Sequence, residues 1–519
     1  MKNHRLVTPL RIKCINSSRP FSNFDYVDCQ FGGLASVRRL FSQARQMNGQ
    51  TVVLEDIPAE GIIRSENYEI REWHDDYEML DLKRLSFWNV KFSQVRSVNS
   101  KVSRQLLGYA ILKRDNVPSL SYDRWHVFES VMLNRWNEQD CLACNKKYSV
   151  NIGEKKFEIM GNLYCQQNEL NKACAQVSLR SLCSLHLNDT QITYRKINEA
   201  AEEAWGPFDK SKGLDSRRIR AVLDKFGIKY NDVDYTVSGD SSDDLPYQKY
   251  LYGGIESGAG ALLGFRRTGA AVDDDHPGKH IIPFFGHTFN KDTWEHRADL
   301  AYFHLGDDTR YLPSETWLGS FIVHDDNFGS NFAIPKRYIT SEQAQYVVEL
   351  LRPKANYGGS EAEAIAIDYL YSFLPYLHSL DNVWLHRLIE HYDRQEVVLR
   401  AICLKKLEYM RHLELMRDWL GVSEDKELIK ILKEGLSDTL WIIEISIPEL
   451  FPANQRKLGE IVLNASAEAT EYRDFTPFLY CRLPGYYLFL KQIRSGSPDF
   501  LPVPSSMISH TRLYRSSPV

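Results

Sequence analysis

Short apolar runs and amphipathic segments alternate along the first third of the chain, and no internal repeat organises them. Continuous apolar stretches at Thr51–Leu54 and Gly108–Leu112 predict β-strands. The spacing of apolar residues in Arg38–Met47 and His126–Asn134 instead predicts short helices. These patterns favour an α+β accessory domain over residues 1–155.

In the middle third, the pattern changes to a succession of helices and strands. The apolar-periodic segment Ala173–Leu187 predicts a buried helix. Ser216–Phe226 predicts another, because Asp215 or Ser216 can cap its start and Gly227 can end it. Further helices are predicted over Ile197–Trp205 and Tyr247–Ile255, and strands over Val233–Val237, Ala259–Phe265, Ile281–Phe285 and Phe321–His324.

The last third starts with helical periodicity and ends with strand-like runs. Helices are predicted over Ser341–Leu351 and Glu361–Leu374, and Pro375 should end or kink the second. The long segment Glu396–Leu420 carries charges on one face and apolar residues on the other, which predicts a third helix. Ser423 is expected to cap a fourth. Strands are predicted over Trp441–Ile447, Glu460–Leu463 and Tyr486–Leu490.

Together these elements predict an α+β protein with three domains. A chain of 519 residues fits this number, because domains usually contain about 150 residues. The N-terminal α+β accessory domain would span residues 1–155 and a central domain residues 156–338. A C-terminal, helix-rich accessory domain would span residues 339–519.

Composition narrows the class of protein. The formal net charge of −4 is close to neutral for this length, so binding to nucleic acid or to a membrane surface is not expected. No run of about 18 apolar residues could span a membrane, and the N-terminus lacks the apolar core of a signal peptide. Nine irregularly spaced cysteines fit reduced thiols. The sequence therefore predicts a cytoplasmic protein.

Cys174 is the first candidate for chemistry. It stands at the start of a predicted helix, where helix amides and a nearby imidazole could stabilise a thiolate. Gln166 and Gln167 lie a short polar loop upstream, and this loop could fold back to place an amide donor beside the thiol. A structural cysteine at a helix start would show the same local pattern, so Cys174 by itself does not indicate catalysis.

A histidine and two carboxylates follow at the ends of predicted strands. His280 precedes an apolar strand that leads to Gly286, and a later strand ends in Asp325 and Asp326. Two antiparallel strands can carry a histidine and a carboxylate side by side. Only one aspartate is expected to orient the histidine, because neighbours on a strand face opposite sides, and the choice between them is open. His287 is a weaker candidate base, since it should point away from His280 along a regular strand.

This ordered series resembles papain-like cysteine peptidases, nearest to the branch that processes bacteriocin leaders. His280 to Gly286 matches the family's spacing from histidine to glycine. Asp326 to Gly329 fits the papain branch, whereas Asp325 to Gly329 fits the leader-processing branch. The resemblance covers about residues 160–335 and neither flank. It departs from the family in a Gln167-to-Cys174 spacing that is one residue longer, in Ala175 after the cysteine, and in the insertion Thr288–Leu318.

The resemblance implies a papain-like fold in the central domain and a set of roles for its residues. Cys174 would be the nucleophile and His280 its base, with Asp325 or Asp326 holding the imidazole. Gln167 or Gln166 would stabilise the oxyanion together with the backbone amide of Cys174.

The predicted activity is hydrolysis of peptide or isopeptide bonds through a thioester. The alternatives are acyl transfer to an amine, as in a transglutaminase-like enzyme, and a catalytically silent papain-like binding module. The expected partners are a peptide or protein substrate and a protein bound through the flanking domains. No cofactor and no metal ligand are predicted, because Cys141 and Cys144 lack a second ligand pair nearby and no phosphate-binding loop is present.

Overall fold

In the computed structural model, the chain forms two compact units. Unit 1 comprises residues 1–228, 262–285 and 322–334, and unit 2 comprises residues 229–261, 286–321 and 335–519. The residues that the structure describes are 11–14, 20–92, 98, 100–134, 140–141, 143–171, 174–187, 192–209, 213–236, 245–267, 279–288, 311–336, 338–420, 434–452, 455–468, 475–493, 498–502 and 510–515.

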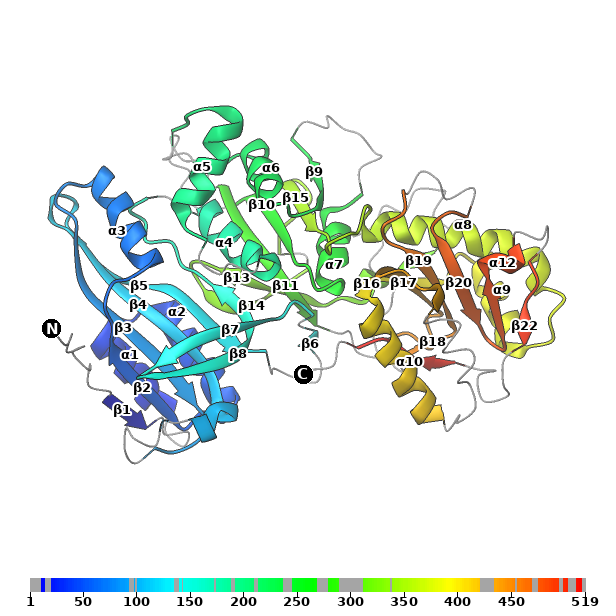
Figure 1. Cartoon of the computed structure of the whole chain (residues 1–519), viewed down its shortest axis with the longest axis horizontal. Coiled ribbons are helices and arrows are strands. Elements are labelled where there is room, and N and C mark those ends of the chain that lie inside the picture. Colours follow the sequence, from blue (N-terminus) through cyan, green and yellow to red (C-terminus); the bar gives the residue numbers. More distant parts are fainter. Residues whose placement is uncertain are drawn as a thin grey trace. The chain divides into compact units, whose positions relative to one another are not determined.

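The N-terminal part of unit 1 is built on a seven-stranded sheet with the order β1-β2-β3-β4-β5-β8-β7, shown in blue and cyan in Figure 1. The neighbouring strands of this sheet pair in antiparallel fashion, as in the tight hairpin of β7 and β8. The strands are β1 (Arg11–Cys14), β2 (Thr51–Asp56), β3 (Glu78–Trp88), β4 (Leu106–Val117), β5 (Tyr122–Leu133), β7 (Lys146–Ile152) and β8 (Lys155–Tyr164).

Helices cover both faces of this sheet. The helices α1 (Pro20–Phe31) and α2 (Ala35–Gln46) share a buried cluster with Leu85 and Phe87 of β3. Helix α3 (Ile62–Trp73) shares another with Leu82, which the two-residue period of a strand places on the opposite face. The predicted helix at residues 38–47 is confirmed as α2. The helix predicted at residues 126–134 is wrong: this segment belongs to β5, whose residues pair with β4.

The C-terminal part of unit 1 combines helices with strands of a second sheet. The strands lie in the order β14-β13-β11-β10. The predicted helices over residues 173–187, 197–205 and 216–226 are confirmed, and the side chain of Asp215 accepts a hydrogen bond from Arg218 N at the start of the third. The elements are α4 (Cys174–His186), α5 (Tyr194–Trp205), α6 (Ser216–Lys225), β10 (Ala261–Arg266), β11 (Lys279–Thr288), β13 (Ser320–Asp325) and β14 (Gly329–Pro335).

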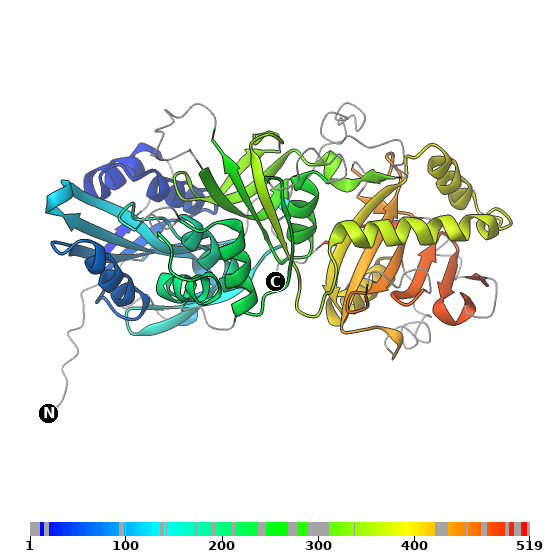
Figure 2. The ribbon, with the colours of Figure 1, turned by 90° about the horizontal axis from the view of Figure 1, so that it is seen from above.

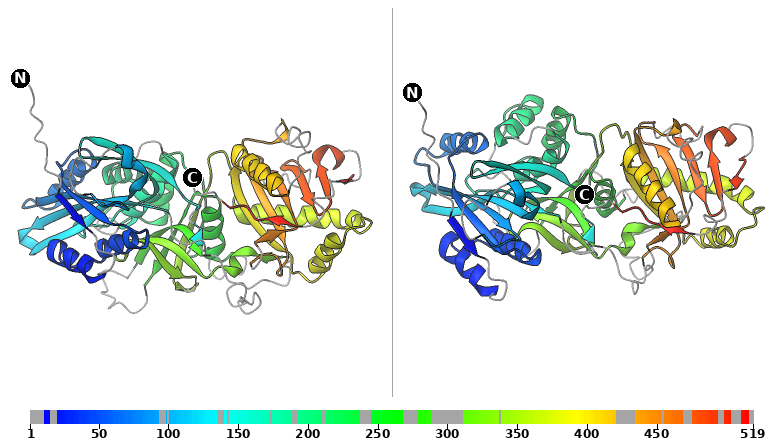
Figure 3. Two further views of the ribbon diagram at one scale, coloured as in Figure 1. Left: turned by 90° about the horizontal axis from the view of Figure 1, so that it is seen from below. Right: turned by 60° about the horizontal axis from the view of Figure 1, so that its bottom comes forward.

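Unit 2 holds a seven-stranded sheet between helices. Its strand order is β12-β16-β17-β19-β20-β21-β22, and α8 lies along one face (Figure 2). Alternate residues of β17 point to opposite cores, so Trp441 and Ile443 pack with α8 and α9, whereas Leu440 and Ile442 pack with α10. Figure 3 shows the ribbon of α10 against the strands of this sheet. The elements are β12 (Leu312–Pro313), α8 (Gly359–Leu377), α9 (Val383–Asp393), β16 (Val398–Lys405), α10 (Lys406–Leu420), β17 (Thr439–Ser446), β19 (Gly459–Asn464), β20 (Phe478–Leu483), β21 (Tyr486–Phe489) and β22 (Leu501–Pro502).

Two helix predictions in unit 2 are wrong. The segment predicted as a helix over residues 341–351 is the strand β15 (Ala344–Leu350), which pairs with β9 (Tyr230–Asp234). The segment predicted as one helix over residues 396–420 is strand β16 followed by helix α10. Helix α8 continues past Pro375 to Leu377. The helix predicted to start at Ser423 lies outside the described residues.

The remaining elements are short or connect these layers. They are the helices α7 (Tyr247–Glu256) and α12 (Leu490–Ile493), the strands β6 (Asp140–Cys141), β18 (Arg456–Lys457) and β23 (Thr511–Arg512), and the 3-10 helices Ser100–Gln105, Pro118–Leu120 and Ser314–Trp317. Within the described part of the chain, no helix is both long and apolar enough to cross a membrane.

The α+β class is thus confirmed. The three-domain division and the papain-like layout stay predictions. The predicted boundary between residues 155 and 156 falls inside β8, in the sheet that starts at β1.

Candidate active site

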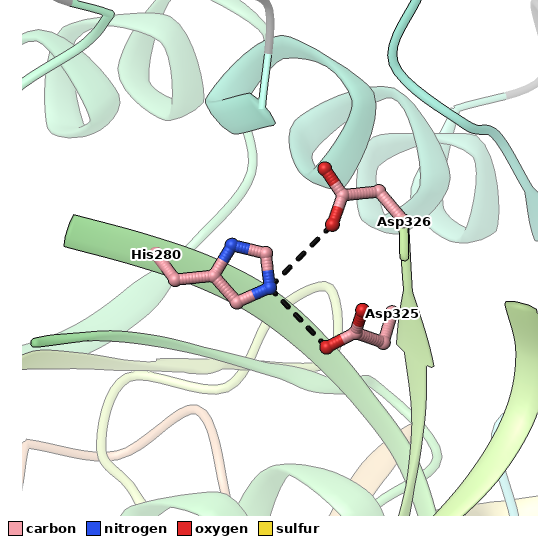
Figure 4. A group of neighbouring side chains, drawn as sticks. All are labelled: His280, Asp325 and Asp326. Atoms are coloured by element: carbon pink, nitrogen blue, oxygen red, sulfur yellow. Dashed lines mark hydrogen bonds and ion pairs between the residues drawn. The ribbon is translucent and has the colours of Figure 1, made fainter. Parts of the chain in front are cut away.

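His280, Asp325 and Asp326 lie together in unit 1 (Figure 4). His280 Nε2 is 3.2 Å from Asp325 Oδ2 and 3.5 Å from Asp326 Oδ1. All three side chains are buried, and only the contact with Asp325 is a hydrogen bond. The structure therefore brings the predicted base together with both candidate carboxylates. Because Nε2 is engaged, Nδ1 is the ring nitrogen that remains for a thiol.

The expectation that only one aspartate faces the histidine is not met, for a local reason. Strand β13 ends at Asp325, and the chain enters a turn at Asp326, so the alternation of a strand no longer applies. Asp325 Oδ1 accepts hydrogen bonds from the backbone amides of Asn327 (2.8 Å) and Phe328 (3.3 Å), which fixes this turn. The turn leaves both carboxylates beside the same ring nitrogen.

Cys174 is the first residue of α4 and is half-buried. One turn further along, Ser178 Oγ donates a hydrogen bond of 3.1 Å to the carbonyl oxygen of Ile281, the residue after His280. Residues four apart on a helix share a face, so this bond turns the Cys174 side of α4 towards the start of β11. Among the described residues, no hydrogen bond joins the thiol to the imidazole.

The two carboxylates differ in acidity. Burial raises the pKa of Asp325, but its hydrogen bond with His280 and the charge of His280 outweigh this effect, so the pKa lies below its ordinary value. Burial and the neighbouring charge of Asp325 hold the pKa of Asp326 above its ordinary value, against the opposing effect of His280. Asp326 Oδ2 is buried and has no hydrogen-bond partner among the described residues. Asp325 is therefore the better partner for an imidazolium.

The electrostatic surroundings of Cys174 oppose ionisation. Burial, followed by the charge of Asp326, raises the pKa of the thiol to about 11. The backbone amides at the start of α4 and the charge of Arg267 act in the opposite direction. A thiolate at this position thus needs its proton removed by a base rather than standing ready in advance.

Arg267 is a site residue that the sequence did not reveal. It follows strand β10, and the ring of Phe265, two residues earlier, packs edge-on against His280 with centroids 5.5 Å apart. The charge of Arg267 lowers the pKa of Cys174 and of both aspartates, and its side chain is exposed. Nothing in the local sequence marks Arg267, because its position beside the site depends on the place of β10 next to β11 in the sheet.

Of the two candidate glutamines, the structure ties Gln166 to the site. Gln166 Oε1 accepts hydrogen bonds from Val127 N (3.0 Å) and Ser36 Oγ (2.9 Å), which leaves Nε2 as a donor. Ser36 also bonds to Tyr164, and the Tyr164 hydroxyl donates to the backbone carbonyl of Asp325 at 3.3 Å. Gln167 is half-buried and makes no hydrogen bond to these groups within the described residues.

The competing histidine has another partner. His287 belongs to unit 2, where its Nε2 lies 2.6 Å from Glu256 and its Nδ1 lies 3.1 Å from the carbonyl oxygen of Thr288. Glu256 also pairs with Arg400. Both ring nitrogens of His287 are occupied, so it has no free nitrogen with which to take a proton from a nucleophile.

The cluster in Figure 4 also has the composition of a cation site. One ligand atom from each of His280, Asp325 and Asp326 lies within 4.8 Å of the others. An imidazole nitrogen with two carboxylates suits a divalent metal ion, and the unpartnered Asp326 Oδ2 offers a further donor.

A second group of this kind lies in unit 2. It consists of His412, Glu444 and Glu460. The ammonium group of Lys457 lies 3.3 Å from His412 Nε2, 2.7 Å from Glu444 and 2.5 Å from Glu460. This ammonium supplies the positive charge that a metal would bring, so the second group is a buried ion-pair network.

Parts of two further sequence features lie outside the described residues. Most of the insertion at 288–318 does so, as does the side chain of Cys141. Cys144 is buried, and none of the described cysteines forms a disulfide.

Models of known protein families, curated proteins and solved structures all fail to match this chain. The function therefore rests on the chemistry of the site.

Proposed function

We propose that unit 1 is a cysteine hydrolase that cleaves peptide or isopeptide bonds through a thioester on Cys174. The observation that carries this proposal is the 3.2 Å hydrogen bond between His280 Nε2 and Asp325, which leaves Nδ1 as the ring nitrogen that can take a proton. The Ser178–Ile281 bond supports it, because it ties the face of α4 that carries Cys174 to the strand that carries His280.

The mechanism follows from these positions. His280 Nδ1 takes the proton of Cys174 as Sγ attacks the carbonyl carbon of the scissile bond. Asp325 steadies the imidazolium through Nε2. The developing oxyanion accepts hydrogen bonds from the backbone amide of Cys174, which starts α4, and from Gln166 Nε2.

The imidazolium then protonates the leaving amine, and the bond between the carbonyl carbon and nitrogen breaks to give a thioester. Water, deprotonated by His280, attacks the thioester and releases the carboxylic acid and the thiol. An amine in place of water would give acyl transfer through the same residues, so product analysis with and without an added amine separates hydrolysis from transfer.

The test is a covalent-intermediate assay. A peptide-like acyl ester or vinyl sulfone probe should label Cys174 in the wild-type chain. We expect the His280→Ala and Asp325→Asn variants to label at least about tenfold more slowly, since removing a base or its partner typically lowers rates by this much or more.

Cys29→Ser is the matched control, because Cys29 is exposed and contributes nothing to the site. Labelling that His280→Ala leaves unchanged would refute the proposal. Labelling of Cys29 at the same rate as Cys174 would also refute it, because mere exposure would then explain the reactivity.

A second candidate rests on the unpartnered Asp326 Oδ2. If the cluster of His280, Asp325 and Asp326 binds a divalent metal, activity would be lost on chelation and restored by the metal. Under the thiol mechanism, chelation leaves activity unchanged and alkylation of Cys174 abolishes it. The two candidates therefore give opposite results in one experiment.

A further inference from the structure

A cavity of about 190 Å³ lies in unit 1 beside the first turn of α4. Its walls come from α3, from α5 and from the chain around Cys174. Asn171 lies three residues before Cys174 and Gln176 two residues after it, and both line this cavity. It is distinct from the cluster of His280, Asp325 and Asp326, since none of these residues lines it.

The lining of the cavity is strongly acidic. Four carboxylates line it, Glu69 and Glu72 from α3 and Glu199 and Glu202 from α5. The one cation among its lining residues is Arg195, which pairs with Glu72 at 2.9 Å and Glu69 at 3.6 Å. Four carboxylates against one guanidinium leave a formal charge of −3. Arg195 thus pairs with both carboxylates of α3.

The cavity also contains buried amide oxygens that accept no hydrogen bond from the described residues. The Gln176 side chain is only 2% exposed, and its Nε2 donates to Asn198 Oδ1 at 2.9 Å. Gln176 Oε1 and Asn171 Oδ1 are buried and have no hydrogen-bond partner among the described residues. A buried acceptor without a donor is costly, by about 1–3 kcal/mol, so these oxygens call for a ligand that donates hydrogen bonds.

The remaining wall suits a flat cation. Trp73 lines the cavity and is 38% exposed, and the face of an aromatic ring attracts a positive charge. A guanidinium group has five N–H donors in a plane, whereas an ammonium has three. Two carboxylates on α5 and two unpartnered amide oxygens together offer more acceptors than an ammonium can satisfy.

We propose that this cavity binds the guanidinium group of an arginine side chain in the peptide substrate. Glu199 and Glu202 pair with it, Gln176 and Asn171 accept its remaining N–H groups, and Trp73 stacks on its plane. As a substrate subsite, it rests on the proposed hydrolase function. Since two lining residues flank Cys174 in sequence, an arginine held here brings its own main chain to the first turn of α4.

The experiment measures binding without turnover. The full chain with Cys174→Ala is titrated by calorimetry with the blocked pentapeptide Ala-Ala-Arg-Ala-Ala and with the same peptide carrying citrulline, which has the shape of arginine and no charge. We expect the arginine peptide to bind at least tenfold more tightly. Arginine amide should compete with the arginine peptide. Agmatine, which carries the guanidinium without the carboxamide, should compete equally well if the guanidinium alone determines binding.

Charge variants locate the binding. Glu199→Gln together with Glu202→Gln should remove the tenfold preference for arginine over citrulline. Glu203→Gln is the matched control, because Glu203 lies on the same helix, outside the cavity, and pairs with Lys225 at 2.8 Å. The control should keep the preference, and equal melting temperatures show that both variants are folded.

Three results would overturn the proposal: equal affinity for the two peptides, an equal loss in the Glu203→Gln control, or displacement of the arginine peptide by millimolar calcium or magnesium. Its failure is separable from failure of the hydrolase proposal. Binding is measured without the thiol, so it stands even if Cys174 is inert. Conversely, if the wild-type chain hydrolyses peptides with no preference for arginine, the arginine-binding proposal is refuted and the hydrolase proposal is not.

Discussion

Replacing Asp326 by asparagine should make Cys174 more reactive, although Asp326 lies in the candidate active site. The reason is electrostatic. The charge of Asp326 is the second-largest cause, after burial, of the raised pKa of the Cys174 thiol. An asparagine keeps the size of the side chain and removes the charge, so the thiolate loses a repulsive neighbour.

The magnitude follows from the acidity of the thiol. A pKa of about 11, against about 8.5 for a free cysteine, leaves roughly 3 thiols in 10,000 ionised at pH 7.5. Burial accounts for more of this difference than Asp326 does, so the asparagine variant should recover up to about one pKa unit, or about 1.4 kcal/mol. The thiolate population then rises by up to about tenfold. Arg267→Gln should act in the opposite direction, because the charge of Arg267 lowers the same pKa.

The assay is the rate of alkylation by iodoacetamide as a function of pH, followed by mass spectrometry of the peptide that contains Cys174. A Cys29→Ser background removes the exposed thiol. Cys183 serves as an internal reference, since it is fully buried and burial raises the pKa of its thiol to about 12. The midpoint of the rate curve gives the pKa of Cys174 in each variant.

Asp325→Asn is the matched comparison. It removes the same charge one residue away, but this carboxylate is bonded to His280 and is not among the leading influences on the thiol. We expect it to shift the midpoint of alkylation by iodoacetamide less than Asp326→Asn does, while it slows hydrolysis and labelling by the peptide-like probe more. If Asp326→Asn leaves the alkylation midpoint unchanged or moves it upwards, or if Arg267→Gln accelerates alkylation, the electrostatic account of the site is refuted.

Three further outcomes are expected. Tyr164→Phe should destabilise unit 1 by about 1 kcal/mol in urea unfolding and lower kcat, because its hydroxyl bonds to the backbone of Asp325. Burial raises the pKa of Glu349 to about 8, so the folded state keeps a proton that the unfolded state releases. Stability is therefore lost as pH rises from about 4.5 to 8, and the melting temperature should fall over this range. Glu349→Gln should flatten this fall. Although burial acts in the opposite direction, Lys457 and Arg482 lower the pKa of Glu460 to about 2. The charged Glu460 therefore stabilises the fold above about pH 4.5, and this stabilisation is lost as pH falls towards 2. Glu460→Gln should lower the free energy of unfolding by about 3–5 kcal/mol at pH 7.

Sequence predicted best what is decided locally. Helix α6 was found because Asp215 caps its start and Gly227, with a φ of 66°, ends it, and both signals lie within the segment itself. Strand β16, which is covered on both faces, was missed. In β16, seven successive residues from Val398 to Leu404 are buried, so no alternation distinguishes the strand from an apolar helix.

The same limit applies to the candidate site. His280 and the pair Asp325 and Asp326 were found because each stands at the edge of an apolar run with a glycine downstream. Arg267 was missed because one arginine after a strand is ordinary in a chain with 64 lysines and arginines, and its meaning depends on pairing with β11. Gln166 and Gln167 could not be separated, since only the fold connects Gln166 to Ser36 and Val127.

The charge of Asp326 helps to raise the pKa of the Cys174 thiol, whereas burial and the charge of Asp325 raise the pKa of Asp326 itself. Each negative charge disfavours the other, so the site holds a single negative charge between them most easily. When Asp326 carries the proton, the thiolate of Cys174 meets only the helix amides and Arg267. Asp325, whose pKa is lowered, stays charged and keeps its hydrogen bond with His280. The two adjacent carboxylates thus have different roles in the proposed mechanism: Asp325 orients the base, and the charge of Asp326 affects how readily the Cys174 thiolate forms.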